Sequence, residues 1–192
     1  MRQNNLPFPF LVAVLLAGCG KKDSQKADSA STMSASADTM GTVAGMQKTP
    51  ARDADQEFMQ TMVDHHQGMV EMADTALKKA ASSRVRAEAT SMLAAQKAEQ
   101  KRMLDMLKTQ YGEDKVPMAL TSDASMVTTL AGASGAAFDR QFREQVIMHH
   151  EEAIKMVDQF LPRLKNPELE QMAEKMKRDQ TTQIAELRKE LK

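Results

Sequence analysis

An ungapped internal repeat limits the folds open to this chain of 192 residues. The motifs Asp55-x-x-Phe58, Asp64-His65-His66 and Met72-Ala73-Asp74 recur with the same spacing as Asp139-x-x-Phe142, Met148-His149-His150 and Met156-Val157-Asp158. Each copy, residues 55–108 and 139–192, is predicted to be one helical hairpin. A hairpin of about 54 residues would be only marginally stable alone, because small domains bury a low fraction of their surface. We therefore predict an all-α fold in which two hairpins close a four-helix bundle.

Capping residues indicate where the helices begin and end. The first helix is predicted to run from Asp53 or Asp55 to about Ala81, the second from Ser82 or Ser83 to Tyr111-Gly112, the third from near Ala136 to just before Pro162, and the fourth from Asn166-Pro167 onward. The crossover between Gly112 and Gly135 has room for a short helix around residues 125–130. Because this crossover is long, the second and third helices need not be neighbours.

The N-terminus has the pattern of a lipoprotein signal peptide. Arg2 precedes an apolar run, Leu6 to Ala17, that is too short to span a bilayer as a permanent helix. The sequence Leu16-Ala17-Gly18-Cys19 resembles a bacterial lipobox, which predicts cleavage after residue 18 and lipidation of Cys19. Gly20 rather than Asp follows, which resembles outer-membrane sorting if the host has two membranes. We predict a protein on the periplasmic face of the cell envelope, held to the membrane by lipid alone.

Residues 19–51 are rich in Ser, Ala, Thr, Asp and Lys, a composition typical of a disordered, flexible tether. The predicted organisation is therefore a signal peptide (1–18), a lipidated tether (19–51) and a helical domain (52–192). Three methionines, Met33, Met40 and Met46, are the tether's large apolar side chains. Two interpretations of them stay open: a loose thioether arm that captures soft metal ions, or neutral drift in a linker.

Composition excludes several classes of function. The 26 Lys+Arg residues balance 26 Asp+Glu, which argues against nucleic-acid binding. The single Cys excludes an intrachain disulfide framework and Cys-rich zinc or iron–sulfur sites. A di-iron oxidase would need Glu-x-x-His motifs, but the residues three positions before the histidines are Met62, Val63, Val146 and Ile147. With no hydrolase motif either, we predict that the protein is not an enzyme.

All four histidines lie in the two His-His pairs. At 100° per residue, His65 and His66 flank a ridge formed by Met62 and Met69 on the inward helix face, and the second pair is placed in the same way. A buried imidazole needs a partner for each ring nitrogen, and a metal ion can be that partner. Imidazole combined with thioether suits Cu(I) or Ag(I). The predicted copper ligands are His65, His66, His149, His150, Met59, Met62, Met69, Met72 and Met156.

The alternative is that the histidines are core residues, bonded to Asp or to backbone, while methionines fill gaps between helices. Two carboxylates, Asp55 and Asp139, also face inward and have two open roles. They could orient imidazoles as hydrogen-bond acceptors in a second shell around the metal, or they could cap the helices on which they lie. Since each is about 15 Å from the His pair of its own helix, any contact with an imidazole must be made between helices.

These motifs, together with Leu130-Ala131-x-x-x-Gly135-x-x-Phe138-Asp139 before the second copy, resemble the domain of unknown function 305 family. The resemblance covers about residues 53–191 and implies a ferritin-like helical bundle in a bacterial secreted or lipid-anchored protein. It also implies periplasmic copper binding, and it marks Asp55, His65, His66, Met72, Asp139, His149, His150 and Met156. This chain departs from the family at Val146-Ile147, where Met-Ile is frequent, and at Gly68-Met69, where Ala is common.

The predicted function is extracytoplasmic binding of copper for buffering, sequestration or resistance. Met62 and Met69 correspond to Val146 and Ala153 in the second copy, so the thioether donors are expected mainly on the first helix. The competing hypothesis is a helical module that contains no metal. Such a module would self-associate or bind an envelope protein through the charged faces of its second and fourth helices.

Overall fold

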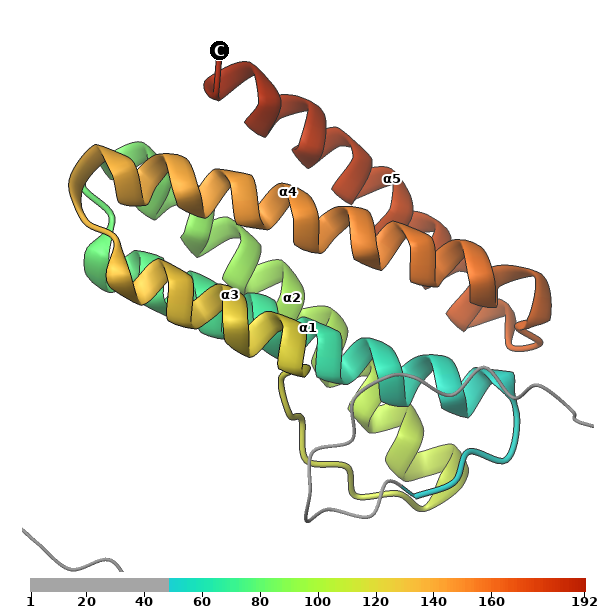
Figure 1. Ribbon diagram of the computed structural model, residues 1–192. Coiled ribbons are helices and arrows are strands. Elements are labelled where there is room, and N and C mark those ends of the chain that lie inside the picture. Colours follow the sequence, from blue (N-terminus) through green and yellow to red (C-terminus); the bar gives the residue numbers. More distant parts are fainter. Residues whose placement is uncertain (1–48) are drawn as a thin grey trace, which may run out of the picture. The chain divides into compact units, whose positions relative to one another are not determined.

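The computed structural model describes residues 49–192 (Figure 1). Regular structure in this range is entirely helical: α1 (Ala54–Lys79), α2 (Ser83–Tyr111), α3 (Thr121–Gly132), α4 (Gly135–Phe160), the 3-10 turn η1 (Leu161–Arg163) and α5 (Pro167–Glu190). The predicted signal peptide, the lipidation site Cys19 and all but the end of the predicted tether lie outside the described residues. No helix in residues 49–192 has both the length and the apolar character needed to cross a bilayer.

Local capping chemistry explains the helix limits. Asp53 accepts a hydrogen bond from the backbone N–H of Gln56 at the start of α1, Ser82 accepts one from Val85 at the start of α2, and Asn166 accepts one from Glu168 at the start of α5. Gly112 ends α2 in the left-handed region, with φ +68°. The predicted limits of the four long helices are thus confirmed to within about two residues, while α3 is longer than the predicted short helix.

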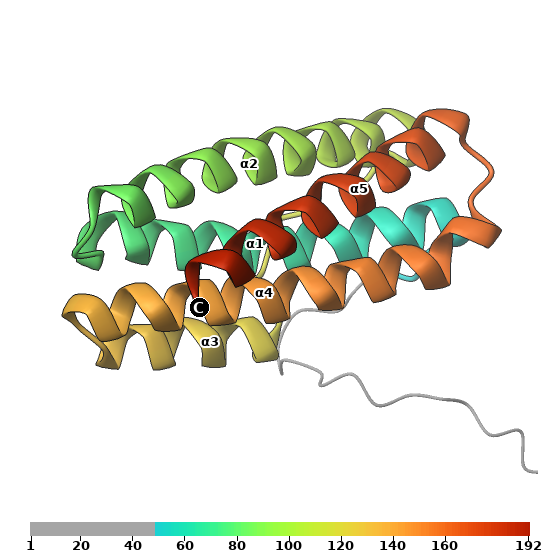
Figure 2. The ribbon, with the colours of Figure 1, turned by 90° about the horizontal axis from the view of Figure 1, so that it is seen from above.

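The helices pack as two hairpins (Figures 1 and 2). One hairpin pairs α1 with α2, and the other pairs α4 with α5; α1 and α4 pack directly against each other. The crossover helix α3 lies against α1 and α4. The all-α prediction is confirmed, with five α-helices in residues 49–192, because the crossover contributes a helix of 12 residues.

Two apolar clusters form the core, one at each end of the α1–α4 contact. The first includes the buried apolar residues between positions 58 and 63 of α1 and between 156 and 160 of α4, with side chains from α2 and α5. The second includes the buried apolar residues between positions 69 and 76 of α1 and between 138 and 147 of α4, again with side chains from α2 and α5. The four histidines fall between these clusters along both helices and are fully buried. Their predicted inward orientation is therefore confirmed.

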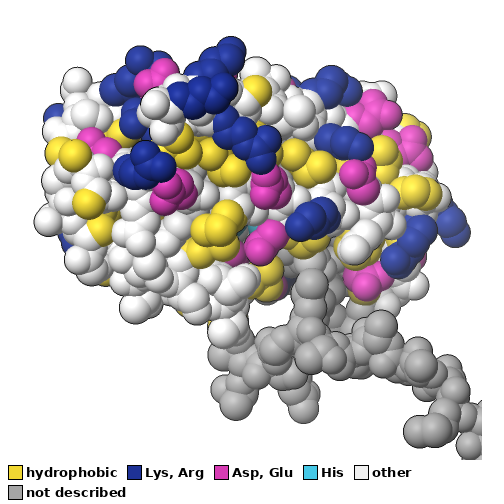
Figure 3. Space-filling model, turned by 45° about the horizontal axis from the view of Figure 1, so that its top comes forward, with side chains coloured by type: hydrophobic (Ala, Val, Ile, Leu, Met, Phe, Trp, Pro, Cys, Tyr) yellow, Lys and Arg dark blue, Asp and Glu magenta, His cyan; other side chains and the backbone are white. Residues whose placement is uncertain are grey.

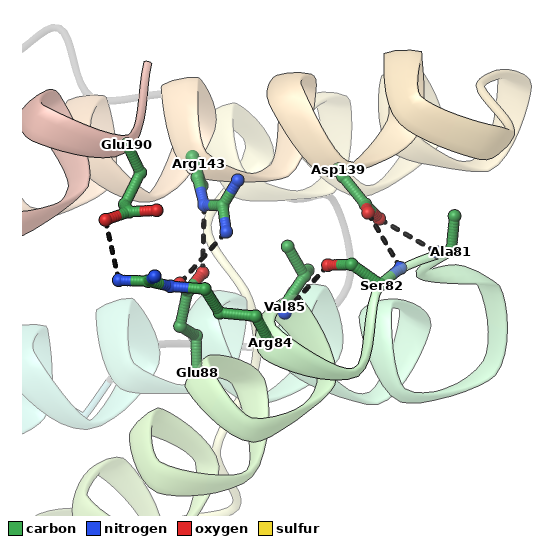
Figure 4. A network of polar contacts seen from close by, with 8 residues as sticks. All are labelled: Ala81, Ser82, Arg84, Val85, Glu88, Asp139, Arg143 and Glu190. Atoms are coloured by element: carbon green, nitrogen blue, oxygen red, sulfur yellow. Dashed lines mark hydrogen bonds and ion pairs between the residues drawn. The ribbon is translucent and has the colours of Figure 1, made fainter. Parts of the chain in front are cut away.

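Each hairpin also holds the turn of the other. The carboxylate of Asp139 on α4 accepts hydrogen bonds from the backbone N–H groups of Ala81 and Ser82, both 2.8 Å long, in the turn between α1 and α2 (Figure 4). At the matching position of the first copy, Asp55 accepts a hydrogen bond of 2.9 Å from the N–H of Lys165, just before α5. Beside Asp139, the guanidinium of Arg143 makes a two-pronged contact with Glu88 on α2, with both N–O distances 3.0 Å (Figure 4).

These contacts differ from both roles considered for Asp55 and Asp139. Within residues 49–192 neither carboxylate is hydrogen-bonded to an imidazole, and the residue that caps α1 is Asp53. The reason for these different contacts is where the two residues lie along their helices. Asp55 and Asp139 lie at the ends of the domain, where tight turns expose backbone N–H groups that need acceptors.

Replacing Asp139 tests this turn contact. In Asp139→Asn one acceptor oxygen is replaced by an NH₂ group that faces a backbone N–H, so we expect a loss of about 1–3 kcal/mol in the free energy of unfolding. Urea denaturation followed by circular dichroism measures it. The control is Asp179→Asn, which removes an exposed pair with Lys175 and should change the free energy by less than about 0.5 kcal/mol. Equal effects of the two variants would contradict the assigned role.

Candidate metal centre

Two imidazoles meet where α1 and α4 pack against each other. The ring centroids of His65 and His149 are 3.8 Å apart and the rings are inclined by 34°. The Nε2 atom of His149 lies 3.0 Å from the backbone carbonyl oxygen of His65. Because a carbonyl oxygen only accepts hydrogen bonds, this Nε2 carries the proton and Nδ1 of His149 keeps its lone pair. That Nδ1 is buried and has no hydrogen-bond partner among the described residues.

His65 is the less satisfied of the two rings. Neither its Nδ1 nor its Nε2 has a hydrogen-bond partner in residues 49–192, although a neutral imidazole must carry a proton on one of them. Burial is the main cause that lowers the pKa of His65; the backbone of His149 acts in the opposite direction without forming a hydrogen bond of normal geometry. A buried ring without partners is costly, so this position needs an explanation.

The outer imidazoles each have one partner from the second helix of their own hairpin. His66 Nε2 lies 3.0 Å from Oε2 of Glu99 on α2, and His150 Nε2 lies 2.7 Å from Oε1 of Gln183 on α5. The two histidines occupy matching positions of the repeat, and so do their two partners. The Nδ1 atoms of His66 and His150 are buried and without hydrogen-bond partners in the described part of the chain.

A carboxylate that sequence reasoning missed completes the centre. Asp123, from α3, is fully buried, and its Oδ1 lies 4.0 Å from Nε2 of His149. One ligand atom each from His65, Asp123 and His149 can be chosen so that all lie within 4.8 Å of one another. Asp123 escaped prediction because the crossover has no counterpart in the repeat.

Gly68 was the sequence signal that could have revealed Asp123. A Cβ atom placed at Gly68 would lie 2.4 Å from Cβ, Cγ and Oδ2 of Asp123, so the absence of a side chain leaves the space that Asp123 occupies. The matching position in the second copy is Glu152, so only the first copy has this space. The departure at Gly68 from the expected Ala thus reflects how α3 packs against α1.

Polar contacts position the crossover that carries Asp123. Asp64, next to the first His pair, accepts a hydrogen bond of 3.0 Å from the N–H of Met118 and forms an ion pair of 2.8 Å with Lys115. At the beginning of the crossover, Gln56 and Gln60 donate to the carboxylate of Glu113. These contacts fix the segment before α3 along α1 and so place Asp123 beside the imidazoles.

Burial determines the charge of the centre. It lowers the pKa of His65 and His149 well below the ordinary value and that of His150 to about 4, and repulsion between neighbouring charged imidazoles adds to the effect. These three rings are neutral at pH 7 and keep lone pairs that can coordinate a metal. Burial, followed by the nearby Glu152, raises the pKa of Asp123 to about 7. A bound cation would favour the ionised form of this carboxylate.

The predicted methionine ligands are all buried but lie on both sides of the imidazoles. Met59, Met62 and Met156 belong to the first apolar cluster, and Met69 and Met72 belong to the second. Met62 and Met69 are seven residues apart, which is about 10 Å along α1, so their thioethers approach the histidines from opposite sides. In contrast, Met148 next to His149 is 46% exposed.

The charged side chains of the surface are mixed in sign. On the face shown in Figure 3, Lys and Arg side chains are interspersed with Asp and Glu side chains.

The fold and the site define a class of protein: an all-α domain with imidazoles and a carboxylate gathered in its core. The chain belongs to the DUF4142 family, a domain of unknown function whose family model matches residues 41–189. No functionally curated protein matches the chain significantly.

Several solved structures share the fold. CopM in the Cu(I)-bound form is 29% identical, with a TM-score of 0.61, and the match covers 70% of this chain and 93% of CopM. CopM in the Ag-bound form obtained by co-crystallization is 30% identical, with a TM-score of 0.60 and the same coverage. A DUF305 fragment from Deinococcus radiodurans has a TM-score of 0.64 at 24% identity, covering 74% of this chain and 98% of the fragment. The predicted resemblance to DUF305 proteins is thus confirmed in the fold.

A substitution at Gly68 tests how Asp123 is accommodated. In Gly68→Ala the new methyl group would overlap the Asp123 side chain, so we expect α3 or the carboxylate to shift and the free energy of unfolding to fall by about 1–3 kcal/mol. Urea denaturation measures the change. Gly132→Ala is the matched control, because a Cβ there meets nothing within 4 Å. If both variants are as stable as the wild-type protein, the close packing described for Asp123 is wrong.

The buried histidines predict a loss of stability in acid. Between pH 6.5 and 4, native His150 stays neutral while the unfolded chain binds a proton there, so unfolding is favoured as the pH falls. His150 alone should account for about 3 kcal/mol of lost stability between pH 7 and pH 4. His150→Gln should remove this part of the pH dependence in urea denaturation at several pH values.

Asp123→Asn provides the contrasting control. The raised pKa of Asp123 means that the native state holds a proton there more tightly than the unfolded chain between pH 3.8 and about 7. Protonation of Asp123 in this pH range therefore stabilises the native state. In Asp123→Asn this contribution is lost, so the free energy of unfolding should fall more steeply as the pH decreases. Identical pH profiles for the wild-type protein and both variants would contradict the assigned protonation states.

Proposed function

We propose that this protein binds a copper-type ion in the core between α1 and α4. The observation that carries the proposal is the state of His65. This imidazole is fully buried and in contact with His149, and both ring nitrogens of His65 lack a hydrogen-bond partner among the described residues. A metal ion would use a lone pair of such a ring and remove the cost of leaving it unpaired. The lowered pKa values favour the neutral, ligating form of the rings.

The available donors suggest which metal would bind. His65, His149 and Asp123 would form the centre, with His66 and His150 beside it and the thioethers of Met59, Met62, Met69, Met72 and Met156 in the adjoining clusters. Imidazole and thioether suit Cu(I) or Ag(I), and the oxygen of Asp123 extends the set toward Cu(II). The solved forms of CopM, which are described as Cu(I)-bound, Ag-bound and Cu(II)-bound, support this choice.

The cellular setting follows from the sequence. With a signal peptide and Cys19 as lipid anchor, the domain would act in the cell envelope, on the periplasmic face and at the outer membrane of a host that has two membranes. Its role there would be buffering, sequestration or resistance rather than catalysis.

For the domain itself, we propose that the two hairpins form a ferritin-like four-helix bundle, built from the two sequence repeats around the metal. The methionines of the predicted tether would then sit between the anchor and the domain.

A second candidate has one specific observation in its favour. His66, His149 and His150 each already make one hydrogen bond within the protein, as core histidines of a helical module without metal would do. Such a module would self-associate or bind an envelope protein. The unpaired second nitrogens of these rings and both nitrogens of His65 favour metal binding over this alternative.

Anaerobic titration with Cu(I) against a competing chelator separates the two candidates. We expect the double variant His65→Gln/His149→Gln to lose affinity roughly a hundredfold, which corresponds to about 2.8 kcal/mol. The control is Met148→Leu, which removes an exposed thioether next to His149 and should leave the affinity unchanged. Binding by the double variant as tight as that of the wild-type protein would overturn the proposed centre.

The thioethers are tested in the same titration. Met62→Leu/Met69→Leu should weaken Cu(I) binding more than Met148→Leu/Met156→Leu, because the second copy of the repeat has Val146 and Ala153 at the positions of Met62 and Met69. Leucine keeps the apolar volume and removes only the sulfur. Equal affinities for the two double variants would count against thioether ligation on α1.

A further inference from the structure

Two polar side chains at matching positions hold the outer imidazoles by the same atom. Glu99 on α2 contacts Nε2 of His66, and Gln183 on α5 contacts Nε2 of His150. Both histidines are fully buried, whereas Glu99 and Gln183 are only partly buried. Glu99 also lines a surface groove of about 540 Å³ between α2 and α5. Each of these two partners therefore lies between the solvent and a buried histidine.

The chemistry of these contacts determines which ring nitrogen carries the proton. A carboxylate only accepts hydrogen bonds, and so does the Oε1 atom of an amide. Nε2 of His66 and Nε2 of His150 must therefore be the donors, and in the neutral ring Nδ1 then keeps its lone pair. Both Nδ1 atoms are buried and have no hydrogen-bond partner among residues 49–192. The carbonyl of His65 imposes the same tautomer on His149.

We propose that Glu99 and Gln183 are positioning residues that fix His66 and His150 as Nε2–H tautomers and so present their Nδ1 lone pairs as ligands for the metal. The inference rests on the proposed metal-binding function for its purpose, but the tautomers themselves are a property of the metal-free protein. Neither Glu99 nor Gln183 would touch the ion.

The two positions are chemically unequal. The anionic acceptor Glu99 polarises its imidazole more strongly than the neutral amide of Gln183, which makes His66 the better electron donor of the pair. The same hairpin contains Gly68, which accommodates Asp123, and the methionines Met62 and Met69. The first hairpin would therefore hold the ion more strongly than the second.

Nitrogen NMR of the metal-free protein tests the tautomers directly. In ¹⁵N-labelled protein at pH 7, long-range proton–nitrogen correlation spectra distinguish a protonated ring nitrogen from one with a free lone pair. We expect protonated Nε2 and unprotonated Nδ1 for His66, His149 and His150. A protonated Nδ1 on His66 or His150 would overturn the proposal, whether or not the protein binds metal.

Variants at position 99 test the consequence for binding. Glu99→Met removes the acceptor while keeping the length of the side chain, so His66 should become a mixture of tautomers and Cu(I) affinity should fall about ten- to a hundredfold. Glu99→Gln keeps an acceptor oxygen and should retain most of the affinity. The charge control is Glu174→Gln, which removes a carboxylate from the same groove but has Arg178 as its partner.

The outcomes separate the positioning role from metal binding itself. Wild-type affinity and an unchanged His66 spectrum in Glu99→Met would overturn the role of Glu99. Equal losses in Glu99→Met and Glu174→Gln would also overturn it, because they would indicate a general effect of charge. If the wild-type protein shows the expected tautomers but binds no Cu(I), the proposed function fails while the tautomer assignment stands. If Glu99→Met does not fold, the wild-type spectrum still decides the assignment.

Discussion

The contact between His65 and His149 is the constraint around which the domain is organised. Two neutral imidazoles, with centroids 3.8 Å apart, occupy the place where α1 and α4 pack together. Polar rings with unpaired nitrogens destabilise a core, so apolar packing elsewhere has to offset them. The two apolar clusters flank the rings, and Asp55 and Asp139 fasten the turns at the ends of the domain. The stabilising contacts thus lie around a polar centre whose ring nitrogens are not all paired.

Most of the fold could be predicted from sequence because it depends on local patterns. Caps such as Ser82 and Asn166 place the helix ends, and helical periodicity turns all four histidines inward. The partners of those side chains could not be predicted, since periodicity gives the direction of a residue and not what lies opposite. Asp123 was missed because α3 has no counterpart in the repeat. Asp55 and Asp139 have unexpected roles because their partners lie in the turn of the other hairpin.

The contacts at matching positions of the repeat show what the two copies share and where they differ. Both copies place a carboxylate on the opposite turn and a polar acceptor on the outer imidazole. They differ at Gly68 and Glu152, at Glu99 and Gln183, and at Met62 and Val146. Each difference adds space, charge or sulfur beside the histidines of α1. The two similar hairpins thus differ in the space, charge and sulfur beside their histidines.

Diffraction from crystals of the protein loaded with Cu(I) under anaerobic conditions tests the central claim most directly, because anomalous scattering at the copper edge locates the ion independently of any assumed ligands. The account predicts an anomalous peak in the core within coordination distance of His65 and His149, with Asp123 or a buried thioether beside it. A peak confined to exposed side chains such as Met148, with no density within coordination distance of a ring nitrogen of His65 or His149, would contradict it.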